Sequence, residues 1–407
     1  MPALLVRDLD QVLSPAGVDA PLRGKALAEI AVVEGGYVLC AEGRIASVGS
    51  MADLGAVSVP DEVVEVDGRG RVAVPGLVDC HTHACFAGDR AAEFELRARG
   101  ASYEELHAAG AGILSTVDAT RAAGAEGLTR ALERHRSWML AHGTTTFEAK
   151  SGYGLDLETE LAQLEAVAAV GGVPTWLGAH AVPPEFEDGD AYLDFALGDV
   201  LPRAAPLAEA ADVFLERGAF DVVQARRYLE ACAEAGLTLR LHADQFTEAG
   251  GIPLAIELEA RSVDHLEATG PAGVDALAAS EVAAVLLPVA ALFLGRPMPP
   301  GRALVDAGAV VALATDFNPG SAFCESLPVA MSLACTQLGL SPAEALAAST
   351  VNAAHVLGRT DRLGRLAAGY TADLVVLDAP DWRYLAYHLG GEDVAVVVKE
   401  GEVVWER

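Results

Sequence analysis

Residues 75–83 read PGLVDCHTH, a short apolar run that ends in two histidines, His81 and His83. Side chains alternate between the two faces of a β-strand, so residues two apart point to the same face. Two imidazoles on one face at the end of a strand suit a metal ion better than core packing. The spacing is only a modest indication by itself, so the rest of the chain decides what it means.

After this stretch, apolar β-type runs alternate with helical stretches rich in Ala, Leu and Glu, a pattern typical of βα units around a parallel sheet. Eight such runs predict an α/β fold, a TIM-like (β/α)₈ barrel. A helix over Ser341–Leu357 has a serine N-cap, Glu344 placed for a capping box and Gly358 just past its end, and we expect it to close the barrel. The predicted strands are Leu77–Cys80, Thr144–Ala149, Thr175–Ala179, Val213–Gly218, Thr238–Leu241, Ser262–Asp264, Val282–Leu287 and Val310–Ala314.

Both ends of the chain show a different pattern, with short β-rich runs separated by turns. Near the amino terminus, predicted strands at residues 30–39 and 45–48 flank a turn at residues 42–44. Near the carboxyl terminus, a tight hairpin is predicted around residues 399–402. We therefore expect residues 1–70 and 359–407 to form one small β-sandwich domain, and residues 71–358 to form the barrel.

The composition argues against several kinds of partner. The chain has 28 Lys and Arg against 58 Asp and Glu, a formal charge of −30, which repels nucleic-acid phosphates and anionic membranes. The longest apolar run, Val282 to Gly295, is too short to span a bilayer and contains Pro288, so we expect a buried strand followed by a turn.

The amino terminus lacks the basic start and unbroken apolar stretch of a signal peptide. The six cysteines are scattered without CxxC spacing, as expected of reduced thiols. Together these features predict a cytoplasmic protein without a nucleic-acid or membrane partner.

Several polar residues directly follow predicted strands. In a (β/α)₈ barrel such residues lie at the carboxyl ends of the strands, the face that carries active sites. Nitrogen donors combined with a carboxylate suit Zn²⁺ or Fe²⁺, and such an ion lowers the pKa of a bound water to about 7. The pattern therefore predicts a metal site suited to hydrolysis. The residues concerned, besides the two histidines at 81 and 83, are Lys150, His180, His242, His265 and Asp316.

The remaining histidines lie in helical or loop settings away from strand ends, and we interpret them as structural or surface groups. The two cysteines that flank the first histidine pair are interpreted as packing residues, because one points to the opposite face of its strand and the other lies past its end. These residues are His107, His135, His142, His355, His388, Cys80 and Cys85.

Longer stretches of the chain resemble a known family. EGRIASVG (42–49), PGLVDCHTH and GRLAAGYTADLVVLD (364–378) are similar to the amidohydrolase superfamily, over nearly the whole chain. More narrowly, HTHACFAGDRAAEFELRARGASYEEL (81–106), FEAKSGYGLDLETELAQL (147–164), LHADQFTEAGG (241–251) and TDFNPGSAFCESLPVAMSLACTQLGLSPAEAL (315–346) resemble the imidazolonepropionases. This resemblance implies hydrolytic ring opening of 4-imidazolone-5-propanoate to N-formimidoyl-L-glutamate in histidine degradation, and it suggests a homodimer.

The resemblance also implies the site residues. His265 is expected beside the metal, where it would polarise the ring carbonyl, and Asp316 is expected both to bind the metal and to transfer the proton. Some family members carry Glu at the position of Gln245, and because an amide cannot act as a base, Gln245 is expected only to orient a ring N–H or a water. The implied ligands of one zinc or iron ion are His81, His83, His242 and Asp316. The implied substrate contacts are Arg90, Tyr153, His180, Gln245, Asn318, Gly320 and Ser321.

The types of these residues suit their implied roles. The planar guanidinium of Arg90 can bind a propionate through two hydrogen bonds, and Tyr153 adds a hydroxyl donor. The sequence does not distinguish zinc from iron, because the same donors bind both.

Three alternatives stay open at this point. A binuclear cyclic amidase of the dihydroorotase or hydantoinase kind would use a carbamylated lysine, for which Lys150 is the candidate. A nucleobase deaminase would share the metal residues but would need Glu where Gln245 stands. A non-catalytic protein could keep the barrel, but it would have no reason to keep every ligand.

Overall fold

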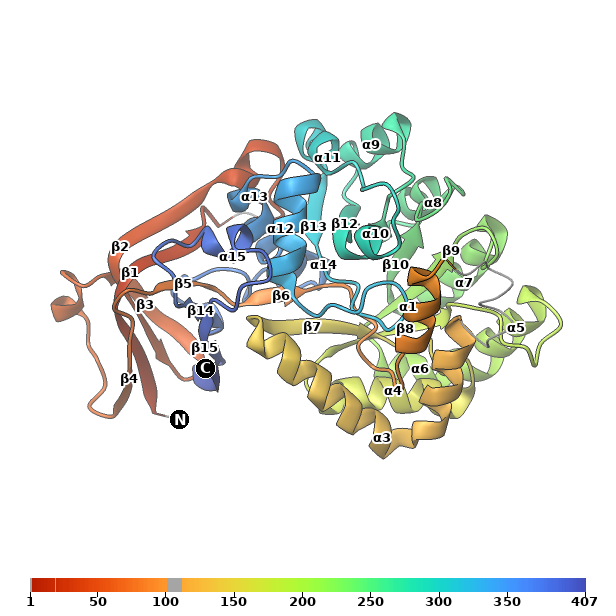
Figure 1. Ribbon diagram of the computed structural model, residues 1–407, viewed down its shortest axis with the longest axis horizontal. Helices are drawn as coiled ribbons and strands as arrows, with labels where there is room; N and C mark the ends of the chain where they lie inside the picture. Colours follow the sequence, from red (N-terminus) through yellow and green to blue (C-terminus); the bar gives the residue numbers. More distant parts are fainter. Residues whose placement is uncertain (1, 19, 101–111) are drawn as a thin grey trace.

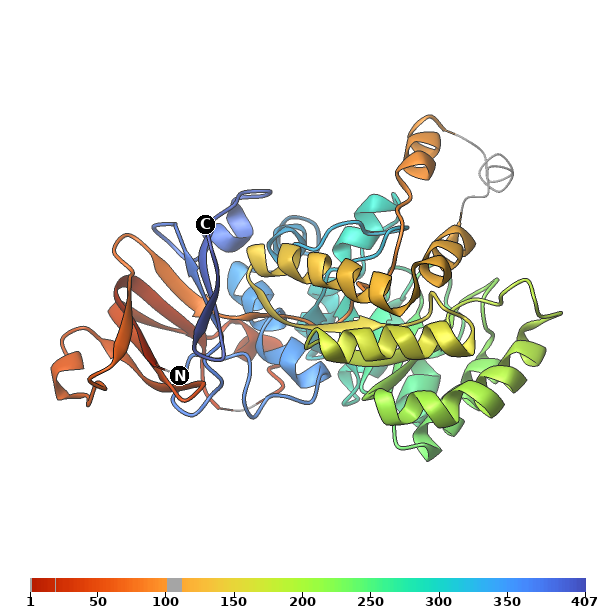
Figure 2. The same cartoon turned by 90° about the horizontal axis from the view of Figure 1, so that it is seen from below.

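The protein is described by a computed structural model, which places residues 2–18, 20–100 and 112–407. Helices surround a barrel of parallel strands, and a smaller mixed sheet lies beside it (Figure 1). The two ends of the chain lie on the smaller sheet, as a quarter turn of the molecule also shows (Figure 2).

Eight parallel strands form the barrel, hydrogen-bonded in the order in which they follow along the chain. This topology confirms the predicted (β/α)₈ fold, since each strand returns beside its predecessor after a crossover. The prediction for the fourth strand was wrong by three residues. Gly218 has a φ of 95°, and Glu216 and Ala219 form a turn, so the strand has ended before them. The strands are β6 (Leu77–Asp79), β7 (Thr144–Lys150), β8 (Val173–Ala179), β9 (Ala210–Leu215), β10 (Thr238–Ala243), β11 (Ser262–His265), β12 (Ala283–Leu286) and β13 (Val310–Leu313).

The first and last barrel strands meet just beyond their carboxyl ends. Thr82 and Phe317 form a parallel bridge there. The main-chain N–H of Asp316 donates to the carbonyl of His81 at 3.0 Å, and that of His83 donates to the carbonyl of Phe317 at 3.0 Å. This contact brings the histidine pair next to an acidic residue more than 230 positions later in the sequence.

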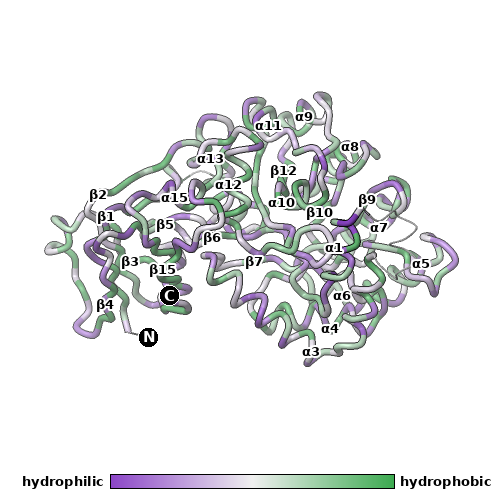
Figure 3. Tube along the Cα trace, in the orientation of Figure 1, coloured by the Kyte–Doolittle hydropathy of each residue, from purple (hydrophilic) through white to green (hydrophobic). Residues whose placement is uncertain are grey.

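Helices cover the outside of the barrel, and hydrophilic residues gather on outer helices such as α3 and α5 (Figure 3). The longest helix, α3, is kinked at Gly124, where φ is 61°. The helices of the first half are α1 (Ala91–Ala98), α3 (Ile113–Ala141), α4 (Leu157–Ala169), α5 (Gly189–Phe195), α6 (Leu201–Ala204) and α7 (Val222–Glu234). Those of the second half are α8 (Gly251–Glu257), α9 (Pro271–Ala278), α10 (Pro288–Phe293), α11 (Gly301–Ala307), α12 (Leu327–Gln337), α13 (Pro342–Ala348), α14 (Val351–Val356) and α15 (Tyr384–Tyr387).

The helix predicted over residues 341–357 is two helices, α13 and α14. Its start is as predicted, with Ser341 and Glu344 forming a capping box. The break lies at Thr350, whose φ and ψ of −131° and −87° are not helical. The carbonyl of Ser349 accepts a hydrogen bond from the main chain of Val78 in β6, at 2.9 Å. A continuous helix would have used that carbonyl internally, so contact with the barrel accounts for the break.

The smaller sheet combines strands from both ends of the chain, as predicted. The predicted hairpin is present, with Lys399 paired to Glu402. The strand β5 pairs with β1 and β14 in this sheet although it lies beyond residue 70, while the predicted domain boundaries themselves stay a prediction. The strands are β1 (Ala3–Pro15), β2 (Ile30–Ala41), β3 (Arg44–Ser50), β4 (Val63–Asp67), β5 (Val72–Pro75), β14 (Leu374–Leu377), β15 (Val394–Lys399) and β16 (Glu402–Glu406).

The apolar run from residue 282 to 295 contains β12 and then α10 rather than a simple turn, because Pro288 begins a helix at its first position. Among the described helices, none combines the length and apolar character needed to cross a membrane. All six cysteines are unpaired, and Cys40, Cys80, Cys85 and Cys232 are buried.

Candidate metal centre

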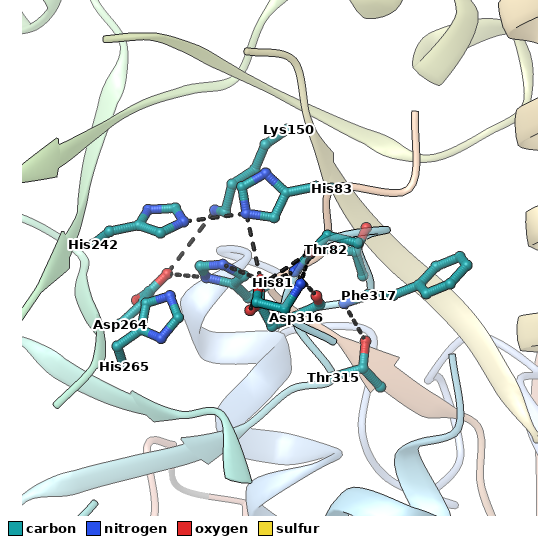
Figure 4. Close-up of polar contacts among 12 residues, drawn as sticks. His81, Thr82, His83, Lys150, His242, Asp264, His265, Thr315, Asp316 and Phe317 are labelled. Atoms are coloured by element: carbon teal, nitrogen blue, oxygen red, sulfur yellow. Dashed lines mark hydrogen bonds and ion pairs between the residues drawn. The ribbon is translucent and has the colours of Figure 1, made fainter. Parts of the chain in front are cut away.

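Four polar side chains converge at the carboxyl ends of the barrel strands (Figure 4). Nε2 of His83 lies 3.2 Å from Nε2 of His242. Oδ1 of Asp316 lies 3.4 Å from Nε2 of His81 and 3.4 Å from Nε2 of His83. All four residues are buried, so the structure brings together the four residues that the sequence indicated as ligands.

Carboxylates behind the rings set the orientation of two of these histidines. Nδ1 of His81 lies 2.5 Å from Oδ2 of Asp264, and Nδ1 of His242 lies 3.0 Å from Oδ1 of Asp212. A proton on Nδ1 that is donated to a carboxylate leaves the Nε2 lone pair free to bind a metal. Burial lowers the pKa of His81 well below its ordinary value, so its ring is a neutral ligand at physiological pH.

The donor atoms fit a metal ion. Within the described residues, Nε2 of His81 and Oδ1 of Asp316 are buried without a hydrogen-bond partner, although such atoms are costly to leave unsatisfied. His81, His83 and Asp316 present donors that all lie within 4.8 Å of one another, and so do His81, His242 and His265. Imidazole nitrogens with one carboxylate are the donor set of zinc and non-haem iron.

Two residues of the cluster have an unusual backbone conformation. His265 has a φ of 88° and Asp316 a φ of 56°, in the left-handed region that non-glycine residues rarely adopt. Such a conformation costs on the order of 1–3 kcal/mol and is concentrated at functional sites. Sequence patterns give no sign of this feature, because it depends on how the strand ends meet.

Asp316 and His265, the two residues expected to transfer protons, both have pKa values shifted from their ordinary values. Burial raises the pKa of Asp316 to about 7. Burial opposes the charged form of His265, but the Glu267 carboxylate, 3.3 Å from Nδ1, outweighs it together with other acidic groups and raises the pKa of His265. With a pKa near 7, Asp316 can both take and give a proton at neutral pH. The raised pKa of His265 favours its protonated form, which can donate.

A cavity of about 280 Å³ opens beside the cluster. All seven residues expected to contact substrate line it: Arg90, Tyr153, His180, Gln245, Asn318, Gly320 and Ser321. Five further residues line the cavity although none of them had been predicted from the sequence: Arg97, Ile113, Phe214, Phe246 and Leu294.

Arg90 is held by an acidic neighbour. Its Nε and Nη2 donate to the carboxylate of Glu93 at 2.8 and 2.5 Å, so this edge of the guanidinium is already engaged and the edge carrying Nη1 is left for a ligand. Arg97, one of the missed residues, donates from Nη2 to the carbonyl of Gly320 at 2.8 Å. Glu93 and Arg97 are four residues apart on α1, so their side chains lie on the same face of the helix. This spacing was the sequence signal that could have placed Arg97 beside Arg90 and Glu93.

The rings of Tyr153 and His180 both lie against the ring of His83. The ring of His180 stacks on that of His83, with centroids 5.2 Å apart, and its Nδ1 lies 2.9 Å from the carbonyl of Gly152. Donation from Nδ1 leaves Nε2 of His180 available as an acceptor. Burial raises the pKa of Tyr153, so its hydroxyl keeps its proton and can donate.

Asn318 differs from the other predicted contacts. Its amide nitrogen donates to the carbonyl of Asp316 at 2.6 Å and to Oγ of Ser321 at 2.9 Å. Its amide oxygen accepts from the N–H groups of Gly320 and Ser321 at 2.8 and 2.7 Å. These bonds use the full capacity of the side chain, so Asn318 shapes the loop that follows Asp316.

Among the described residues, the histidines interpreted as structural make contacts outside the metal cluster. His135 stacks on Phe86 with centroids 4.5 Å apart. His388 lies 3.0 Å from Asp393 on the surface, and His142 lies 3.5 Å from Glu325. His107 lies outside the described residues.

Comparisons with known proteins identify the family of the chain. Residues 72–404 match the model of the amidohydrolase family. The chain is 62% identical to an imidazolonepropionase of Rubrobacter xylanophilus, over 98% of this chain and 97% of that protein. It is 47% identical to an imidazolonepropionase of Herpetosiphon aurantiacus, over 95% and 94% of the two chains.

Solved structures share the fold at low sequence identity. An adenosine deaminase from Xanthomonas campestris with bound zinc has a TM-score of 0.72 at 20% identity, covering 98% of this chain and 92% of that one. Guanine deaminase from E. coli has a TM-score of 0.74 at 16% identity, covering all of both chains. At these identities the likeness to solved structures concerns the fold alone. The sequence matches at 62% and 47% identity cover nearly the full length and therefore identify the family. The chain belongs to the amidohydrolase family and, within it, to the imidazolonepropionases.

Proposed function

We propose that this protein hydrolyses 4-imidazolone-5-propanoate to N-formimidoyl-L-glutamate, a ring-opening step of histidine degradation. The observation that carries the proposal is a single cavity lined both by buried metal donors and by two guanidinium groups, Arg90 and Arg97. The donors suit hydrolysis of a cyclic amide, and the guanidiniums suit a substrate that carries a carboxylate. The 62% identity to the imidazolonepropionase of R. xylanophilus supports it.

We assign one zinc or iron ion to His81, His83, His242 and Asp316. When bound, such an ion polarises a carbonyl and lowers the pKa of the attacking water. The protein contributes the orientation of the ligands through Asp264 and Asp212, described above.

The cavity residues would hold the ring in place. The edge of Arg90 that carries Nη1 would bind the propionate, because Glu93 occupies the opposite edge. Tyr153 would donate to the ring, and Nε2 of His180 would accept from it. Gln245 is buried in the cavity wall and, as an amide, would orient a ring N–H or the water.

Asp316 and His265 would move the protons. The water oxygen bonds to the ring carbonyl carbon, and the bond between that carbon and the ring nitrogen breaks. Asp316 takes the proton of the water and passes it to the leaving nitrogen, and His265 donates to the carbonyl oxygen as negative charge develops on it. The ring carbonyl becomes the new carboxylate of the product.

Two rival activities are disfavoured by particular residues. A carbamate-bridged binuclear centre needs a neutral amine at Lys150, but its Nζ lies 2.7 Å from Glu148 and 2.8 Å from Asp212 in ion pairs. A deaminase needs a carboxylate as proton shuttle where Gln245 stands. A non-catalytic role leaves the unpartnered buried donors without a reason.

We also propose that the protein is a cytoplasmic homodimer. The six unpaired cysteines support a reducing compartment. The dimer rests on the resemblance to imidazolonepropionases, and light scattering coupled to size-exclusion chromatography tests it.

An assay of the purified protein tests the activity. We expect loss of the absorbance of imidazolone propionate, formation of N-formimidoyl-L-glutamate by mass spectrometry, and one metal ion per chain by elemental analysis. A chelator should stop the reaction, and adding zinc or iron back should restore it. A metal-loaded protein that leaves this substrate intact, or that releases ammonia from a nucleobase, would contradict the proposal.

A further inference from the structure

Lys150 is the buried lysine among the three in the chain, all of which the structure describes. It is the last residue of β7 and has no exposed surface. A buried ammonium must be surrounded by acceptors or opposite charges to be tolerated. Its neighbours therefore indicate what it does.

Three carboxylates from three strands surround this ammonium. Nζ of Lys150 lies 2.7 Å from Oε1 of Glu148, 2.8 Å from Oδ2 of Asp212 and 3.9 Å from Oδ2 of Asp264. All three carboxylates are fully buried. One cation thus joins β7, β9 and β11 inside the barrel, directly beside the candidate metal centre (Figure 4).

Two of these carboxylates are the groups that orient metal-binding histidines. Asp212 contacts Nδ1 of His242, and Asp264 contacts Nδ1 of His81. The third carboxylate, Glu148, accepts from the main-chain N–H of Thr82 at 3.1 Å, and Thr82 lies between the two histidines that follow β6. Each carboxylate around Lys150 therefore contacts either the ring of a predicted metal ligand or the main chain between two of them.

We propose that Lys150 is a positioning residue for the metal centre, whose ammonium holds Asp212 and Asp264 where they turn Nε2 of His242 and of His81 toward one shared ion. The inference rests on the metal site proposed above. Without the ammonium, the buried carboxylates repel one another and lose a partner, so they rotate away from the imidazoles. The rings then lose the orientation that presents their lone pairs together.

Arg240 offers a matched comparison, because it contacts the same oxygen of Glu148 as Lys150 does. It is also a buried cation, 2% exposed, and its Nη1 lies 3.1 Å from Oε1 of Glu148. Within the described residues, its other hydrogen bonds go to the carbonyls of Cys80 and Val356, rather than to the carboxylates that hold histidines. Loss of Arg240 therefore removes a buried charge while leaving the hydrogen bonds and ion pairs of Asp212 and Asp264 in place.

The test compares Lys150→Met with Arg240→Met in the full chain. Zinc affinity is measured by competition with a chromogenic chelator, ligand geometry by the visible absorption of the cobalt-substituted protein, and stability by thermal melting without metal. We expect Lys150→Met to bind zinc about 10- to 100-fold more weakly, as is typical for loss of a group behind a metal ligand, and to show an altered cobalt spectrum. Arg240→Met should lose stability but keep a wild-type spectrum and affinity. Wild-type zinc affinity in Lys150→Met, or an equal loss in both variants, would overturn the inference.

A charge-balanced variant keeps the inference testable if Lys150→Met does not fold. Glu148→Gln combined with Lys150→Met removes a carboxylate together with the ammonium, and Glu148→Gln alone is its reference. We expect the double variant to bind zinc more weakly than the reference by a similar factor, and equal affinities would overturn the inference. Absence of zinc binding in the wild type would instead refute the metal site itself. A second ion that binds only with bicarbonate and is lost in Lys150→Met would establish a carbamate, which also overturns the positioning role.

Discussion

The backbone of Gly320 lies against the guanidinium of Arg90, so closely that a Cβ at position 320 would overlap Nη1. Glu93 holds the opposite edge of the same guanidinium through two hydrogen bonds. Glu93 therefore holds the guanidinium of Arg90 by hydrogen bonds, and the lack of a side chain at position 320 leaves the space that the guanidinium occupies. The φ of Gly320 is one that any residue can adopt. Glycine is therefore required at this position for space rather than for backbone conformation.

Gly320→Ala should therefore weaken substrate binding. The added methyl displaces the flexible end of Arg90, and losing a hydrogen bond to a charged group costs about 1.5–3 kcal/mol, or roughly 10- to 100-fold in KM. Steady-state kinetics measure this, with Gly55→Ala as control because a Cβ at Gly55 meets nothing within 4 Å. A wild-type KM in Gly320→Ala would contradict the fixed position of Arg90.

Arg90→Lys should also raise KM while leaving kcat closer to the wild-type value. Lysine keeps the positive charge but loses the planar group that binds Glu93 and the propionate together. The measurement is KM for the substrate compared with KM for an analogue that lacks the carboxylate. If the substitution affects both compounds equally, Arg90 does not recognise the propionate.

His242→Ala should remove bound metal and activity together while the barrel stays folded. The ring contributes one donor at the end of β10, on the loop face rather than in the apolar core. Metal per chain by elemental analysis and far-UV circular dichroism check the two parts of this expectation. Full turnover with a normal metal content would exclude His242 as a ligand.

Asp316→Asn should nearly abolish turnover even when metal is supplied in excess, because an amide oxygen can bind a metal but cannot take a proton. The expected loss is about 10²- to 10⁴-fold in kcat. Gln245→Ala should lower the rate only moderately, and Gln245→Glu should remain active. Metal content is measured with each rate. Normal turnover in metal-replete Asp316→Asn would assign the proton transfer to another group, with His265 the nearest candidate.

His355→Gln should reduce the dependence of stability on pH in mild acid. Burial, aided by the charge of Arg261, lowers the pKa of His355 to about 4 from an ordinary value near 6.5. Between these values the unfolded chain binds a proton that the folded protein does not, so stability increases as pH rises from 4 to 6.5. Chemical denaturation at several pH values should show a shallower increase in His355→Gln than in the wild type. Parallel curves for the two proteins would show that this histidine does not contribute.

Much of the fold could be predicted because its signals are local. Alternating apolar runs and capped helices repeat within a few residues, which is the range over which strand and helix periodicity operate. The hairpin before Glu402 and the capping box of Ser341 were predicted for this reason. The break at Thr350 could not be, because the partner of Ser349 is Val78, more than 270 residues away in the sequence.

The sequence by itself determined the barrel, the smaller sheet, the family and the residue types that converge at the strand ends. Only the tertiary structure decided how those residues act on one another: Glu93 and Gly320 fix Arg90, and three carboxylates surround Lys150. The left-handed backbone of His265 likewise depends on how the barrel strands end. The physical reason is that periodicity and residue type are properties of short segments, whereas distances between charges arise only when distant segments are packed into one barrel.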